Sequence, residues 1–274
     1  MIRILTCTCF ILLYATNTYA QTLTGTPAPS NSNEPLEITA DTTLEWLRNE
    51  QKFIARGNAL AVQGTSAVAA QTLTADYIDT PKNGMQISIV TAERDVIITS
   101  QDSKAYGDKA IHDMTKGIAT ITGSNLRMIS PDQTVTARDK FEYFVEQGRL
   151  NAIGNARATR PNKSGGNDTI TADTLSAVFT QNAKGQRVLK TLEAKGNVII
   201  ITPTEEATGD YAIYRATTDK AELKGDVEIT RGPNILKGER AEIDLKTNKS
   251  TIFAPQTQNG RVRGVFFPGS EKNE

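Results

Sequence analysis

Short apolar stretches interrupted by Gly-Asn or Gly-Asp recur along the chain. The stretch "LEAKGNVIIITP" begins at Leu192, and "AELKGDVEITRG" begins at Ala221, 29 residues later. In every copy, the residues one and three positions after the Asn or Asp are apolar. Because side chains alternate between two faces along a β-strand, this pattern predicts strands with one uniformly apolar face. The aligned positions are Asn58, Asp95, Asn125, Asn155, Asn197 and Asp226.

A second short motif, a small residue followed by an acidic one, alternates with the first. It ends in Asp in six copies and in Glu in a seventh, less similar copy. Both motifs return after roughly 30 residues, which indicates an internal repeat whose units stack on one another. The acidic residues are Asp41, Asp76, Asp108, Asp139, Asp173, Asp210 and Glu239.

The glycine of the first motif allows two interpretations. A two-residue hairpin turn at Gly-Asn would place Lys195 opposite Val198 and would mix charges into the apolar face. A strand that runs through the glycine and bends there keeps that face apolar, so we favour a bend. On this interpretation the same face also carries Phe53, Val90, Leu150, Leu192 and Ala221.

The sequence before the repeats predicts an exported protein. Residues 1–20 combine one Arg, an apolar run and a terminal Ala20, which is typical of a cleaved signal peptide and predicts a mature chain that starts at Gln21. Residues 21–35 are rich in Pro, Ser and Asn, so we expect a flexible linker there.

From Leu36 on, runs of Val, Ile and Thr between Gly, Asn and Asp predict an all-β chain. The only stretch compatible with a helix extends from Thr42 to Lys52. We expect one set of repeats over residues 36–160, a second set stacked on it over residues 161–254, and a C-terminal tail over residues 255–274.

Composition argues against several functional classes. The 274 residues hold 31 Lys and Arg against 31 Asp and Glu, so no nucleic-acid partner is expected. Both cysteines lie in the expected signal peptide, and His112 is the only histidine. We therefore expect no catalytic residues, no metal site, no cofactor and no enzymatic activity. The recurrent Asp residues are better explained as turn formers than as glycosidase carboxylates.

The alternation of "GN-V-x-I" with "AD-x-L" behind a signal peptide resembles the OstA-like (LptA-type) family of lipopolysaccharide transport proteins. The resemblance covers Leu36 to Ala254, and the tail "RVRGVFFP" fits it as well. It implies stacked antiparallel strands in a V-shaped, slightly twisted β-jellyroll. It also implies a periplasmic bridge that carries lipopolysaccharide acyl chains in an apolar groove between LptC-like inner-membrane and LptD-like outer-membrane proteins.

The repeats then assign a lipid-binding groove, with Glu228 facing outward. Its residues are Val96, Ile98, Leu126, Met128, Val198, Ile200, Val227 and Ile229. The same apolar stripe could instead be a sealed core. A stacked sheet that does not close leaves unpaired strands at both ends, so head-to-tail self-association is expected. The alternative function is that of a secreted parallel β-helix, either an adhesin or a polysaccharide-acting enzyme.

Overall fold

The computed structural model describes residues 35–81, 84–100, 102–162, 165–183, 187–244, 246–247, 249–256 and 260–267. The expected signal peptide lies outside this part of the chain. So do residues 21–34 of the expected linker and residues 268–274 of the expected tail.

The described residues form an 18-stranded sheet and one short 3-10 helix, η1, at Arg48–Glu50. The first strands are β1 (Glu37–Thr39), β2 (Thr43–Leu47), β3 (Lys52–Gln63), β4 (Ser66–Thr80), β5 (Gly84–Ser100), β6 (Ser103–Asp113), β7 (Ile118–Thr122), β8 (Arg127–Ser130) and β9 (Gln133–Thr136). The remaining strands are β10 (Lys140–Phe144), β11 (Arg149–Pro161), β12 (Asn167–Gln181), β13 (Arg187–Ile201), β14 (Glu206–Arg215), β15 (Lys220–Arg231), β16 (Asn234–Asp244), β17 (Lys249–Phe253) and β18 (Arg263–Val265).

The all-β prediction is confirmed, while two other expectations are wrong. The stretch from Thr42 to Lys52 is not an α-helix, and only Arg48–Glu50 form a 3-10 turn. Its first half is strand β2, in which Leu44 pairs with Ala55 and Trp46 pairs with Phe53 of β3. This pairing outweighs the local helix propensity. The parallel β-helix is excluded because the pairings between the described strands are antiparallel, from β1–β3 at one end to β16–β18 at the other.

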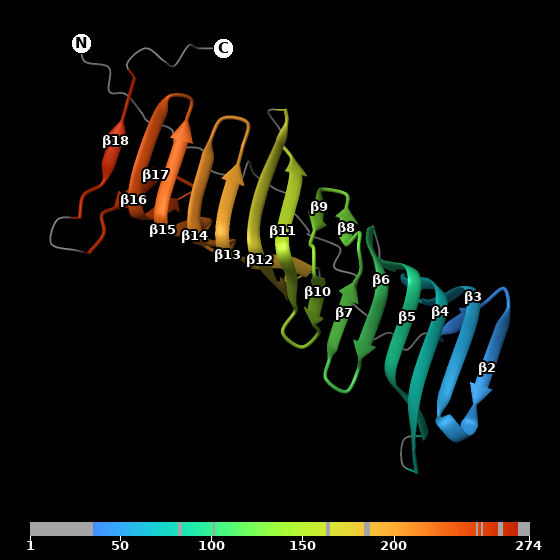
Figure 1. Cartoon of the computed structure of the whole chain (residues 1–274). Helices are drawn as coiled ribbons and strands as arrows, with labels where there is room; N and C mark the ends of the chain where they lie inside the picture. The colour runs from blue at the N-terminus through green and yellow to red at the C-terminus, as the bar shows by residue number, and fades with distance from the viewer. Residues whose placement is uncertain are drawn as a thin grey trace.

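The sheet is folded into two arms, and most strands contribute to both. In β13, for example, Thr191 to Lys195 pair with β14 on one side of a bend and Val198 to Ile201 pair with β14 on the other. The first arm contains β2, β7, β10 and β17, and the second arm contains β1, β8, β9 and β18. Figure 1 shows the strands side by side in chain order along an elongated body. Buried side chains from both arms form one core between them.

The bends in β3, β5, β11, β13 and β15 are β-bulges at the aligned Asn or Asp, which follows a Gly in four of them, and the sequence predicted bends at these glycines. The pairing register shifts between Lys195 and Val198, and both residues of the motif adopt left-handed backbone angles, with φ of 76° at Gly196 and 49° at Asn197. Gly tolerates this conformation without strain, and Asn tolerates it better than most residues. The same register shift occurs at Gly57-Asn58, Arg94-Asp95, Gly154-Asn155 and Gly225-Asp226.

The two sequence motifs meet at these bends, although they come from neighbouring parts of the sheet. Asn197 donates a hydrogen bond from Nδ2 to Oδ2 of Asp173 at 2.9 Å, and Asn58 makes the same bond to Asp41 at 2.8 Å. A Cβ atom at Gly196 would overlap the Asp173 carboxylate. The acidic motif therefore requires the glycine of the other motif, which explains why both share one period.

Two copies depart from the alignment made on the sequence. Asp76 lies beyond the bend of β4, where it pairs with Lys52, and Gln71 takes the place next to Asn58, with 3.1 Å between Gln71 Nε2 and Asn58 Oδ1. At Asn125 the chain leaves the sheet between β7 and β8 instead of forming a bulge. The backbone amide of Ser124 still donates a hydrogen bond to Asp108 at 2.8 Å.

The segment around Arg160 connects β11 and β12 within the sheet. Arg160 pairs with Asp168 in the register, and its guanidinium lies 3.1 Å from the buried carboxylate. The ion pair holds the base of this hairpin. A division of the repeats into residues 36–160 and 161–254 stays a prediction.

Candidate functional site

The inner face of the second arm carries a continuous row of apolar residues, one from each strand. Successive members are register partners, so the row crosses the whole sheet. We call it the second-arm row: Ile38, Ala61, Val68, Ile98, Ala105, Met128, Val135, Ala158, Ile170, Ile200, Ala207, Ile229, Leu236 and Gly264. Strands in a sheet are ~4.8 Å apart, which gives the row a length of roughly 60 Å.

Two further rows run along the inner face of the first arm. The deep row, nearer the bends, consists of Leu44, Ala55, Leu73, Ala92, Ala110, Ile121, Phe141, Ala152, Leu175, Ala194, Ala212, Leu223, Ala241 and Ile252. The shallow row consists of Trp46, Phe53, Ala75, Val90, His112, Ala119, Tyr143, Leu150, Ala177, Leu192, Tyr214, Ala221, Ile243 and Ser250.

All eight residues assigned to the groove lie on this inner face. Ile98, Met128, Ile200 and Ile229 belong to the second-arm row. Val96, Val198 and Val227 follow the bulges directly, and Leu126 lies in the connection between β7 and β8. Seven of them are buried and Ile98 is partly buried, all in one cluster. The stripe is thus packed between the arms in this structure, and lipid binding by these residues remains a prediction.

Glu228 faces outward, as predicted. Its carboxylate forms an ion pair with Lys237 of β16 at 2.6 Å, and both side chains are solvent-accessible. The outer face carries similar cross-strand pairs, such as Lys109 with Glu93 at 2.8 Å. Exposed pairs of this kind contribute less than about 1 kcal/mol each, and they keep the outer face polar while the inner face is apolar.

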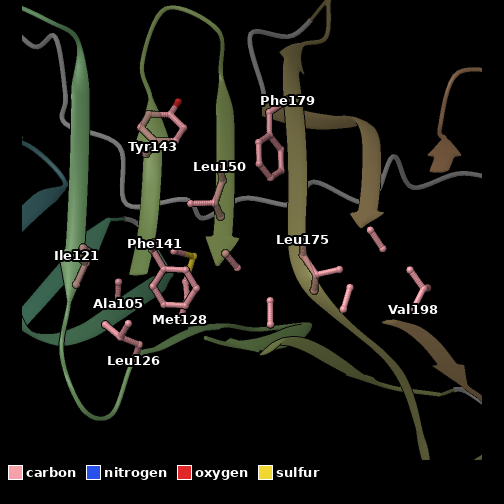
Figure 2. Close-up of a cluster of buried hydrophobic side chains, with 14 of the residues drawn as sticks. Ala105, Ile121, Leu126, Met128, Phe141, Tyr143, Leu150, Leu175, Phe179 and Val198 are labelled. Atoms are coloured by element: carbon pink, nitrogen blue, oxygen red, sulfur yellow. The ribbon is translucent and has the colours of Figure 1, made fainter. Parts of the chain in front are cut away.

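The core changes in the middle of the molecule. Alanine is frequent in the deep row, but Ile121 and Phe141 are large, and they pack with Leu126 and Met128 of the same buried cluster. Figure 2 shows Phe141 among these side chains. Protein interiors hold few voids larger than a water molecule, so a space among these side chains is a departure from close packing.

A cavity of about 60 Å³ lies beside Phe141. Its lining is almost entirely apolar and comes from both arms, including Val68 and Ile98 of the second-arm row and Val90 and Leu150 of the shallow row. Sequence reasoning missed this cavity. It had placed Val90 and Leu150 on the apolar face, but the size of the space depends on how the two arms pack.

Three residues that line this cavity carry polar side-chain groups: His112, Thr120 and Tyr143. Burial lowers the pKa of His112 below its usual range, and the negative charge of Asp113 opposes the shift only in part. The imidazole is therefore neutral at neutral pH. A neutral imidazole carries one hydrogen-bond donor and one acceptor, here at the wall of a mostly apolar space.

The N-terminal end of the shallow row is aromatic and open to solvent. Trp46 stacks on Phe53 with 5.4 Å between ring centroids, and its indole N–H donates a hydrogen bond to the Tyr77 hydroxyl at 3.0 Å. Trp46 is nonetheless 49% exposed, because β2 pairs only with β3. The apolar inner face therefore reaches the edge of the sheet.

The described residues contain no helix that is both long and apolar enough to cross a membrane. In the same part of the chain, no three His, Cys, Asp or Glu side chains gather in a way that could hold a metal ion.

Fold and site together define a class of protein: an elongated, repetitive antiparallel sheet whose two arms enclose a continuous apolar interior. The family model described as LptA/(LptD N-terminal domain) LPS transport protein matches residues 37–149 and again residues 139–249. The chain belongs to this family of lipopolysaccharide transport proteins.

A search of solved structures finds LptH of Pseudomonas aeruginosa, described as the LptA-homologous periplasmic component of the lipopolysaccharide transport device. The sequences are 14% identical, the match covers 88% of this chain and 100% of LptH, and the TM-score is 0.22. A search of curated proteins finds no match.

Proposed function

We propose that this chain is an LptA-type periplasmic bridge that shelters the acyl chains of lipopolysaccharide between its arms during transport from the inner to the outer membrane. The observation that carries the proposal is the set of three mostly apolar rows. The second-arm row runs from β1 to β18, and the two rows of the first arm run from β2 to β17. Family membership supports the same role.

The energetic argument concerns the exposure of acyl chains to water. Each exposed CH₂ costs ~0.8 kcal/mol, so a 12-carbon chain stands to lose roughly 9 kcal/mol. A row of equivalent apolar positions removes this cost at every step and binds no position much more tightly than the next, which permits sliding. The sequence has no phosphate-binding loop motif, so we propose that another protein supplies the energy.

Lipid binding in this way requires the arms to separate. The cavity of about 60 Å³ is less than half of the ~150 Å³ that an engineered protein cavity uses to hold benzene. An acyl chain therefore has to displace side chains of the second-arm row from the deep row. We propose that the arms separate by rotation about the bends, where the β-bulges interrupt the regular strand pairing.

Photo-crosslinking in cells tests the proposal. A photoreactive residue at Ile200 or Ile229 is expected to capture lipopolysaccharide, because both positions face the other arm. The matched control is Glu228, the neighbour of Ile229 that points to solvent, where no capture is expected. Equal capture at all three positions, or at none, would favour the sealed core instead.

We also propose that the chain contacts LptC-like and LptD-like neighbours, and second copies of itself, through its two ends. Among the described pairings, β1 and β2 pair only with β3, while β17 and β18 pair only with β16. The unpaired edges are templates for strand addition.

Deletion of residues 241–274 is expected to abolish concentration-dependent oligomers in sedimentation velocity. The deletion removes β17 and β18 and the part of β16 that supports β17. Deletion of residues 268–274 alone serves as the control and should leave the oligomers in place. If the longer deletion oligomerises like the full chain, the edge used for assembly lies elsewhere.

A further inference from the structure

We infer that this chain consists of two structural units fused end to end, and that the strand pairing between them in the middle of the chain is a built-in copy of the contact between successive chains. The inference rests on the proposed function, because it concerns the self-association proposed for the two ends. It adds the boundary between the units and the residue-by-residue register in which the C-terminal edge of one chain takes the N-terminal edge of a second copy.

Strands that are split between the two arms occur at both ends of the sheet and again in its middle. At the N-terminal end, β1 lies in the second arm and β2 in the first; at the C-terminal end, β17 lies in the first arm and β18 in the second. In the middle, β7 and β8 are divided between the arms in the same way, and so are β9 and β10. The middle therefore has the form of a C-terminal edge, β7 and β8, joined to an N-terminal edge, β9 and β10.

The edge formed by β9 and β10 repeats the edge formed by β1 and β2. The corresponding register pairs are Ile38–Ala61 and Val135–Ala158 in the second arm, and Leu44–Ala55 and Phe141–Ala152 in the first arm. The connections between the arms agree as well. The Asp41 amide donates a hydrogen bond to the Gly57 carbonyl at 2.8 Å, and the Arg138 amide donates one to the Gly154 carbonyl at 2.7 Å. All these counterparts keep one constant offset in sequence, so the two edges are equivalent residue by residue.

The edge formed by β7 and β8 is repeated by β17 and β18. The corresponding register pairs are Ala110–Ile121 and Ala241–Ile252 in the first arm, and Ala105–Met128 and Leu236–Gly264 in the second arm. The glycine at the bend of the supporting strand has matching neighbours in both cases. An added Cβ atom would meet Ile121 and Leu126 at Gly107, and Ile252 and Val262 at Gly238. Leu126 and Val262 are therefore counterparts.

The boundary between the two units lies at the turn Pro131-Asp132, which connects β8 to β9. The first unit then runs from β1 to β8 and the second from β9 to β18. The family model supports two units, because it matches residues 37–149 and again residues 139–249. This boundary differs from the division at residue 160 that the sequence predicted, where β11 and β12 form one hairpin.

Positions that are buried at the middle junction are exposed at the two ends. Phe141 is 1% exposed, whereas its counterpart Leu44 is 60% exposed. Leu126 is 3% exposed, whereas its counterpart Val262 is 50% exposed. Exposed apolar groups of this kind mark interaction surfaces, because their burial in a contact is favourable. The N-terminal and C-terminal edges thus carry the apolar side chains that a junction like the middle one buries.

The middle junction also provides the register between copies. There β7 pairs with β10 and β8 pairs with β9, so we expect β17 and β18 of one chain to pair with β2 and β1 of the next. With the residue of the second copy named last, the expected pairs are Ile252–Leu44, Thr251–Glu45, Ser250–Trp46, Lys249–Leu47, Arg263–Thr39, Gly264–Ile38 and Val265–Glu37. This register places no like charges opposite one another, which would oppose the pairing.

Cysteine cross-linking tests this register, since both cysteines of the sequence lie in the expected signal peptide. Directly opposed residues of antiparallel strands have Cα atoms ~4.5–5.5 Å apart, within the range that a disulfide spans. In the full mature chain, Glu45→Cys combined with Thr251→Cys should give, on oxidation, a ladder of dimers, trimers and longer species on a non-reducing gel. Reductant should return the ladder to a single band.

Two further double variants serve as controls. Thr120→Cys with Glu142→Cys occupies the equivalent pair of the middle junction, so its disulfide should close within one chain and give no ladder. Glu45→Cys with Lys249→Cys keeps the same strands and the same face but shifts the register by two residues. The two Cα atoms are then roughly 7–8 Å apart, too far for a disulfide, and no ladder is expected.

Leu44→Asp provides a measurement that needs no disulfide. Leu44 is exposed in the single chain, so the urea midpoint of the monomer should stay unchanged. The same side chain is buried in the expected contact, so oligomers should be lost in sedimentation velocity. An unchanged urea midpoint also shows that the variant is folded.

Several outcomes would overturn the inference. If wild-type chains oligomerise but E45C/T251C gives no ladder, or no stronger a ladder than E45C/K249C, the register is wrong and the self-association stands. L44D that oligomerises like the wild type has the same meaning. A T120C/E142C disulfide that does not close would show that the middle pairing is absent in solution. Wild-type chains that never oligomerise would refute the proposed self-association itself, while lipopolysaccharide capture at Ile200 still tests the lipid-binding role separately.

Discussion

Replacement of Ile229 by aspartate is expected to lower the free energy of unfolding by at least about 4 kcal/mol. Ile229 is 2% exposed and lies between Ala207 and Leu236 in the second-arm row. The substitution loses about 1.5–3 kcal/mol of apolar burial and adds the cost of a carboxylate that no partner compensates. Urea unfolding followed by circular dichroism measures the change.

The control for this experiment is Glu228→Ala on the same strand. It removes one exposed ion pair with Lys237, and should cost no more than about 1 kcal/mol. The comparison of the two variants also tests whether the arms are closed or already separated in solution. If I229D is as mild as E228A, water reaches the second-arm row and the arms are already apart in solution. If it is severe, lipid binding must involve a separation of the arms that the resting protein resists.

The sequence predicted the bends and the apolar face because both depend on local chemistry. A glycine followed by Asn or Asp, as at Gly196-Asn197, permits two consecutive left-handed residues, and the period of two on either side assigns each side chain to a face. Val198 and Ile200 could therefore be placed on the inner face without knowledge of the partner strands. The structure confirms this orientation through their burial.

The features that the sequence did not predict depend on how separate strands combine. Asp76 has the same local motif as Asp173, but the pairing of β3 with β4 places Gln71 at the bend instead. The stretch from Thr42 to Lys52 was only weakly compatible with a helix, and its first half is an edge strand that pairs with β3. The cavity beside Phe141 arises where large side chains of both arms meet, and no single strand contains that information.

The bends themselves are expected to control stability, and Gly196 is the clearest case. Gly196→Ala should lower the free energy of unfolding by about 2–4 kcal/mol. Its φ of 76° strains any residue with a Cβ atom, which costs about 1–2 kcal/mol. The new methyl group would also push the Asp173 carboxylate away from Asn197, with the loss of about one hydrogen bond.

A double-mutant cycle separates these two contributions. In an Asp173→Ala background the carboxylate is absent, so G196A should cost only the backbone strain, and a coupling energy of about 1–2 kcal/mol should appear between the two positions. Gly232→Ala is the matched control, because its φ is 52° and no atom lies within 4 Å of the added Cβ. It should show the strain alone in both backgrounds. A coupling energy near zero would mean that the carboxylate moves freely and that the two motifs share their period for another reason.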